Sequence, residues 1–111
     1  MKFQKPYPYN LIDDIIQGED FKSELSEAEL IQEVETMIDD LSKVAAFKKG
    51  SHERTQAVIH LLYVDGLSYR EIAERLGVTK SRIGQIRQRG IRILRHPSRL
   101  NRLLLGNEDE S

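Results

Sequence analysis

The sequence predicts an all-α protein, a small helical bundle with a helix-turn-helix near its C-terminal end. Three observations support this prediction. Apolar residues recur at helical spacing through most of the chain, two Ser-x-x-Glu capping boxes mark helix starts, and Gly or Pro follows several of the apolar runs. A chain of 111 residues has the size of one domain.

Residues 1–25 are predicted to form an N-terminal extension with one short helix. Pro6 and Pro8 favour extended backbone at its start. Asn10 is expected to cap a helix that ends at Gly18. The apolar side of this helix predicts a small docking element or, as the favoured alternative, a helix that folds back on the main body.

Residues 26–105 are predicted to form the main domain, and residues 106–111 an acidic tail. Ser26 opens a capping box with Glu29 and begins a helix that is expected to end near Phe47. The next four residues, 48–51, predict a turn in which Ser51 caps the following helix. That helix is expected to end at Asp65-Gly66.

A helix-turn-helix follows in the second half of the chain. Ser68 opens a second capping box, Gly77 allows a tight turn, and Thr79 caps the last long helix. Helix, glycine turn and helix are the order of this motif. The long helix is expected to end at Pro97 and to bury Ile83, Ile86, Gly90, Ile93 and Leu94. Leu100, Leu103 and Leu104 then predict a short closing helix.

Charge is distributed unevenly along the chain. The formal net charge is -1, and the first 50 residues hold eleven acids against six lysines. Residues 79–102 contain no acid and carry Lys80, Arg82, Arg87, Arg89, Arg92, Arg95, Arg99 and Arg102. A concentrated basic segment predicts a surface that binds phosphate, and therefore a nucleic-acid partner.

The first turn of the long helix supports the same prediction. Lys80 and Arg82 lie near the positive end of the helix dipole, which disfavours each cation by roughly 0.3–1 kcal/mol. No acid compensates them within that turn. An external anion such as DNA phosphate is expected to do so.

The outward face of the long helix carries side chains that can read bases. At about 100° per residue, Ser81, Gln85, Gln88 and Arg92 lie opposite the apolar stripe, and Gln can pair with the edge of adenine. Arginines on either side are expected to contact phosphates. The predicted DNA-binding residues are Arg70, Thr79, Lys80, Ser81, Arg82, Gln85, Gln88, Arg89, Arg92, Arg95 and Arg99.

Residues 66–79, together with Arg82-Ile83, Gln85-Ile86 and Arg95-His96-Pro97-Ser98-Arg99, resemble region four of bacterial RNA polymerase sigma factors. The resemblance implies a four-helix unit that inserts a recognition helix, about residues 80–96, into the major groove of the promoter's minus thirty-five element. It also implies docking on the flap-tip helix of the polymerase β subunit, through apolar residues of the earlier helices.

The chain departs from that family pattern at four positions. Primary sigma factors usually have Arg, Glu, Arg and Glu where this chain has Lys80, Ser81, Gly84 and Arg87. Lysine keeps the charge but lacks the bidentate fork of arginine, and glycine makes no side-chain contact. We therefore expect a different target sequence and binding that depends more on the DNA backbone.

Three functional interpretations remain open at this point. The length predicts a free-standing region-four-like transcription factor, encoded by a phage or mobile element, or half of a split sigma factor. A dimeric helix-turn-helix repressor or activator that never contacts polymerase is the first alternative, with the acidic helix of residues 26–47 as its dimer interface. A module that binds a protein or RNA partner through the acidic half is the second.

Enzymatic function is not expected. His52, His60 and His96 lack the spacing of metal ligands, no Gly-rich phosphate loop is present, and no cofactor or metal is predicted. The chain has no Cys and no apolar run long enough to span a membrane. The expected location is the cytoplasm of a bacterial or phage-infected cell.

Overall fold

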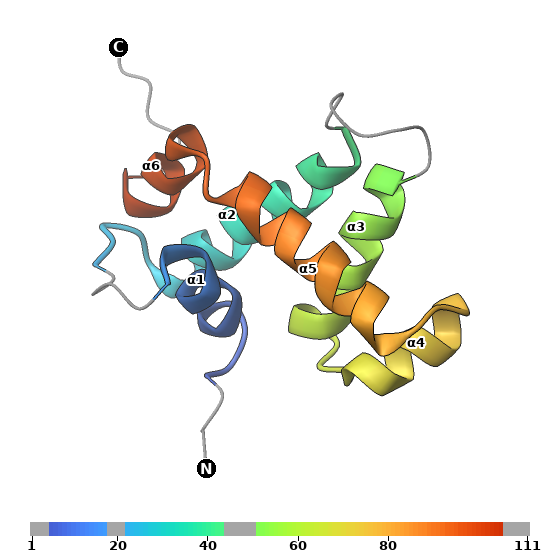
Figure 1. Ribbon diagram of the computed structural model, residues 1–111. Coiled ribbons are helices and arrows are strands. Elements are labelled where there is room, and N and C mark those ends of the chain that lie inside the picture. The colour runs from blue at the N-terminus through green and yellow to red at the C-terminus, as the bar shows by residue number, and fades with distance from the viewer. Residues whose placement is uncertain (1–4, 18–21, 44–50, 106–111) are drawn as a thin grey trace.

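A computed structural model describes residues 5–17, 22–43 and 51–105, and its regular elements in these ranges are all helical (Figure 1). The all-α prediction is therefore confirmed. The elements are α1 (Tyr9–Ile16), α2 (Glu27–Asp40), the 3-10 turn η1 (Leu41–Lys43), α3 (Ser51–Ile59), the π-helical turn η2 (His60–Val64), α4 (Tyr69–Leu76), α5 (Lys80–Leu94) and α6 (Pro97–Leu105).

Both predicted capping boxes form. The Ser26 hydroxyl accepts from the Glu29 amide at 3.2 Å, while the Glu29 carboxylate accepts from the Ser26 amide at 2.8 Å. Ser68 and Glu71 repeat the arrangement at 3.1 and 2.8 Å. Hydrogen bonds from Ser68, first from its backbone amide, lower the pKa of Glu71. The cap therefore stabilises the fold near neutral pH and loses that contribution as pH falls through the lowered pKa.

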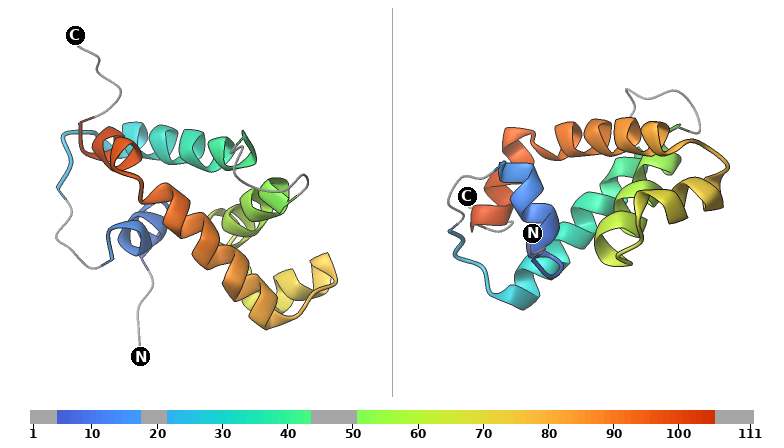
Figure 2. Two further views of the ribbon diagram at one scale, coloured as in Figure 1. Left: turned by 45° about the horizontal axis from the view of Figure 1, so that its top comes forward. Right: turned by 60° about the horizontal axis from the view of Figure 1, so that its bottom comes forward.

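Helix α5 crosses the molecule and joins two hydrophobic clusters (Figure 1). Its first half packs Ile83 and Ile86 with residues of α3 and α4. Its second half packs Ile91 and Leu94 with buried residues of α1, α2 and α6. The two views in Figure 2 show α3 and α4 beside the first half of α5 and α6 beyond its C-terminal end.

The N-terminal helix α1 is part of the main core. Leu11, Ile12 and Ile15 are at most 1% exposed and belong to the same cluster as α2, α6 and the second half of α5. The favoured prediction, that this helix folds back on the body, is confirmed. The alternative of a docking element with an available apolar side is wrong, because that side is already covered.

The ends of α1 differ from the sequence prediction. The helix begins at Tyr9 after Pro8 without a side-chain cap, and the Asn10 amide instead donates to the Tyr63 carbonyl at 3.1 Å. The helix ends at Ile16, and its C-cap Gln17 adopts a left-handed conformation with φ 57°, while Gly18 lies outside the described residues. Asn10 is thus used for a tertiary contact with η2 rather than for a cap.

The helices on either side of the 44–50 segment also differ in detail from the prediction. Helix α2 ends at Asp40 and tightens into η1, while Phe47 and the expected turn at 48–50 lie outside the described residues. The end of the next helix near Asp65-Gly66 is confirmed, but its last turn is the wider η2, in which the Asp65 amide donates to the His60 carbonyl at 3.1 Å. This turn carries Tyr63, which contacts both α1 and α5.

The buried side of α5 is close to the expected one. Ile83, Ile86, Gly90 and Leu94 are buried as predicted, but Ile93 is only half-buried. Ile91, which the prediction left out, is 7% exposed and packs in the cluster that contains α1. The error arises because α1 widens the buried side of α5 beyond the stripe that one helix alone predicts.

Two glycines of α5 provide a matched test of this packing. A Cβ at Gly90 would lie 2.8 Å from Cγ1 of the buried Ile59, whereas a Cβ at Gly84 would lie 3.6 Å from the Tyr69 ring. We expect Gly90→Ala to lower the free energy of unfolding by about 1–3 kcal/mol through overpacking. Gly84→Ala should raise it by about 0.5–1 kcal/mol through helix propensity. Urea unfolding measures the stability of both variants. A Gly90→Ala variant with the free energy of unfolding of the wild type would contradict the packing of α3 on α5.

Candidate nucleic-acid interface

The turn between α4 and α5 is built as the sequence predicts. Gly77 ends α4 in a left-handed conformation with φ 70°, which glycine adopts without strain. The Thr79 hydroxyl accepts from the Arg82 amide at 3.1 Å and begins α5. Val78 packs between the two helices against the hydrophobic cluster of α3, α4 and the first half of α5. These contacts fix the angle at which α5 leaves the turn.

The polar side of α5 faces outward as predicted. Its exposed residues are Lys80, Ser81, Gln85, Gln88 and Arg92, and Thr79 before them is also exposed. Arg82 is half-buried, and its guanidinium donates to the Gln85 side-chain oxygen at 3.2 Å. That bond orients the Gln85 amide, which is the group best suited to read an adenine edge.

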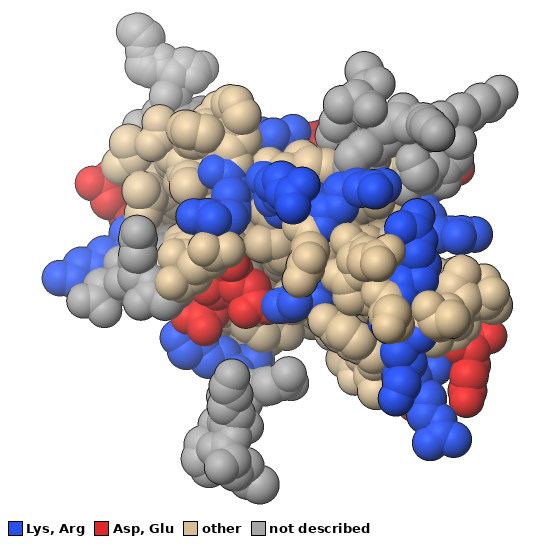
Figure 3. Space-filling model, viewed as in Figure 1, with Lys and Arg blue, Asp and Glu red and all other residues tan. Residues whose placement is uncertain are grey.

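Further cations lie beside this polar row. At helical spacing, Arg82 and Arg89 lie on one side of it and Arg95 on the other, and Arg99 follows in the first turn of α6. Arg70 is exposed in the first turn of α4 and pairs with Glu74 at 3.5 Å, an exposed contact that contributes little to stability. Figure 3 shows Lys and Arg atoms in a row along α5.

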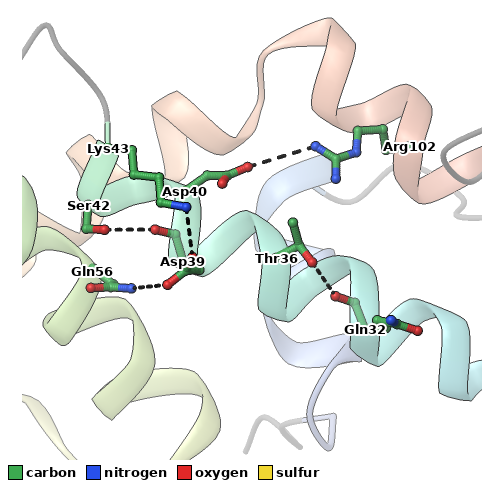
Figure 4. A network of polar contacts seen from close by, with 8 residues as sticks. All are labelled: Gln32, Thr36, Asp39, Asp40, Ser42, Lys43, Gln56 and Arg102. Atoms are coloured by element: carbon green, nitrogen blue, oxygen red, sulfur yellow. Dashed lines mark hydrogen bonds and ion pairs between the residues drawn. The ribbon is translucent and has the colours of Figure 1, made fainter.

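Two arginines of the basic segment pair with carboxylates of other helices and are only partly exposed. Arg87 pairs with Asp14 of α1 at 2.7 Å, and Arg102 pairs with Glu33 at 3.1 Å. Arg102 also lies 3.9 Å from Asp40, as Figure 4 shows. The basic segment is therefore not one continuous surface. The other cations of the segment are Lys80, Arg82, Arg89, Arg92, Arg95 and Arg99.

Arg87, Asp14 and Tyr63 form a cluster that the sequence prediction missed. The Arg87 Nε donates to the Tyr63 hydroxyl at 2.7 Å, and that hydroxyl donates to the same Asp14 oxygen that Arg87 contacts. Burial lowers the pKa of Arg87, but the hydrogen bonds to Asp14 and Tyr63 raise it by a larger amount. The pKa is therefore raised overall, and the guanidinium stays charged. Burial first, and then the bond to Asp14, raises the pKa of Tyr63. The cluster joins α1, η2 and α5.

One signal in the sequence could have revealed this cluster. Asp13 and Asp14 lie between the apolar pairs Leu11-Ile12 and Ile15-Ile16, and Arg87 directly follows Ile86 of the predicted apolar stripe. A carboxylate and a guanidinium that both need a partner are expected to pair. Their separation of 73 positions in the chain gives no local pattern from which to make that match.

The matched family is consistent with this geometry. Residues 52–96 match the family model for Sigma-70, region 4, a segment that includes nearly all of α3 and the whole of η2, α4 and α5. This part of the chain resembles sigma region four, a DNA-binding helix-turn-helix domain of transcription regulation. No curated protein and no solved structure matches the chain significantly.

Two other site types find no support within the part of the chain that the structure describes. No helix there has the length and apolar character that crossing a membrane requires. No group of three or more His, Cys, Asp or Glu side chains there could hold a metal ion.

The pairing between α1 and α5 can be tested by a double-mutant cycle. Asp14→Asn and Arg87→Gln should each lower the free energy of unfolding by about 1–2 kcal/mol, because each leaves a half-buried polar partner unsatisfied. The free energy of unfolding of the double variant should fall by less than the sum of the two single losses. Additive losses in urea unfolding would show that the two side chains are not coupled.

Proposed function

We propose that this protein is a transcription factor that inserts α5 into the major groove of promoter DNA and docks on the β flap of RNA polymerase. The observation that carries the DNA part is the exposed row Ser81, Gln85, Gln88 and Arg92 on a helix whose other side is buried. The uncharged residues of this row reach bases, while its Arg92 and the cations beside it contact phosphates. Cytoplasmic location follows from this role.

The eleven predicted DNA-binding residues keep distinct roles in this proposal. Gln85 and Gln88 read base edges, helped by Ser81. Arg82, Arg89, Arg92, Arg95 and Arg99 bind phosphates, as do Lys80 and Arg70, while Thr79 holds the start of α5. Because Gly84 faces the Tyr69 ring and presents no side chain, fewer groups reach bases than in primary sigma factors. Much of the affinity therefore comes from the DNA backbone.

The phosphate contacts predict a loss of affinity and of salt dependence. Arg82→Ala and Arg92→Ala should each weaken binding to a labelled duplex and reduce the slope of log K against log salt by about one unit. Lys43→Ala, which removes an exposed cation from η1, is the matched control and should leave the slope unchanged. Fluorescence anisotropy over a salt series measures both quantities. If Arg82→Ala and Arg92→Ala change the affinity and the salt slope no more than Lys43→Ala does, α5 is not the DNA-binding helix.

Gln85 predicts a different kind of effect. Gln85→Ala should relax the preference at one base pair, by about 1–3 kcal/mol of discrimination, while the salt slope stays the same. Selection of bound sequences from a random pool, for the wild type and the variant, measures this change. Identical selected sequences would remove Gln85 from the base-reading row.

Polymerase docking rests on the family match alone, and a competition experiment tests it. The chain should be retained by bacterial core RNA polymerase and released by an excess of the isolated β flap. Lack of retention, in a protein that still binds duplex DNA, would favour the dimeric repressor or activator. The apolar side of α2 is buried within this chain, which leaves only the acidic side of that helix for a dimer contact.

A further inference from the structure

Two carboxylates of α1 lie next to the second half of α5. Asp13, Asp14 and Gln17 line a hollow of about 520 Å3 whose opposite wall includes Gln88, Arg92 and Arg95. Figure 3 shows acidic atoms over α1 directly beside the row of basic atoms along α5. Acidic and basic groups therefore meet at the edge of the proposed DNA-binding surface.

The hollow lies on one side of the polar row only. At helical spacing, Arg87, Ile91 and Arg95 lie on the side of α5 that faces α1, while Arg82 and Arg89 lie on the opposite side. A recognition helix in a major groove has a phosphate backbone on each side. One backbone would therefore meet Arg82 and Arg89, and the other would meet Arg95 together with the carboxylates of α1.

These carboxylates are held in place. Three buried apolar residues anchor α1 in the core, and Asp14 is bound by Arg87 and Tyr63. Asp13 differs from Asp14, because its side chain is 46% exposed and its ion-pair partner is the exposed Lys5 at 3.3 Å. Such an exposed ion pair contributes little free energy, so it does not hold Lys5 firmly beside Asp13. Asp13 thus presents a negative charge that α1 cannot easily withdraw.

We propose that α1 forms one edge of the nucleic-acid interface, where Asp13 and Asp14 limit the approach of a phosphate backbone to the second half of α5. On that side the carboxylates weaken the phosphate contact of Arg95, while Arg82 and Arg89 on the opposite side contact phosphates without them. The Asp14 carboxylate also occupies the position on the Arg87 guanidinium that a phosphate would otherwise take. This inference rests on the proposed DNA binding, and it makes α1 a part of the site.

Removal of the Asp13 charge should strengthen binding, an effect that structural damage does not produce. With a labelled duplex of mixed sequence at low salt, Asp13→Asn should lower Kd about two- to threefold and Asp13→Lys further, to about tenfold. The gain should shrink as salt rises. Glu27→Gln removes the same charge from the exposed first turn of α2, outside the hollow, and should have a smaller effect.

The outcomes separate this inference from the proposed function. The inference is supported if Asp13→Asn lowers Kd more than Glu27→Gln does, and if Asp13→Lys lowers it further. Equal effects of Asp13→Asn and Glu27→Gln, in a protein whose binding Arg92→Ala still weakens, overturn the inference and leave the DNA-binding helix intact. A wild-type protein that does not bind the duplex overturns both.

Discussion

Burial of one side of α5 along its whole length is the constraint on which the rest of the structure depends. Ile83 and Ile86 are buried with α3 and α4, whereas Ile91 and Leu94 are buried with α1, α2 and α6. Each such side chain contributes about 1.5–3 kcal/mol when fully buried. Rotation of α5 would expose residues of both clusters at once. The direction of the polar row is therefore set by the core and does not depend on the row's own contacts.

The N-terminal helix and the unusual Arg87 are two parts of one arrangement. A basic residue at this position of a bare helix-turn-helix would point along the edge of the DNA-binding surface. Here Asp14 binds it, and the Tyr63 hydroxyl bridges the two. Arg102 forms ion pairs with Glu33 and Asp40 of α2. Internal pairing thus concentrates the outward positive charge on a narrower strip than the sequence alone predicts.

Local signals in the sequence predicted the helix-turn-helix and both capping boxes, because Ser68, Gly77 and Thr79 act on atoms only a few residues away. Contacts between distant segments could not be predicted in the same way. Asn10 fits a helix cap by sequence, yet it bonds the Tyr63 carbonyl 53 positions away. The burial of Ile91 and the inward turn of Arg87 likewise depend on where α1 packs, which no local pattern encodes.

The central claim is that the exposed side of α5 binds duplex DNA, and amide chemical-shift mapping tests it most directly. An isotopically labelled protein would be titrated with a duplex of mixed sequence. The account predicts that the largest shifts fall on the first half of α5 and the start of α4, with smaller shifts toward Arg95 and little change along α2. Shifts concentrated on the acidic side of α2, with α5 unaffected, would contradict it and favour a protein-interaction module.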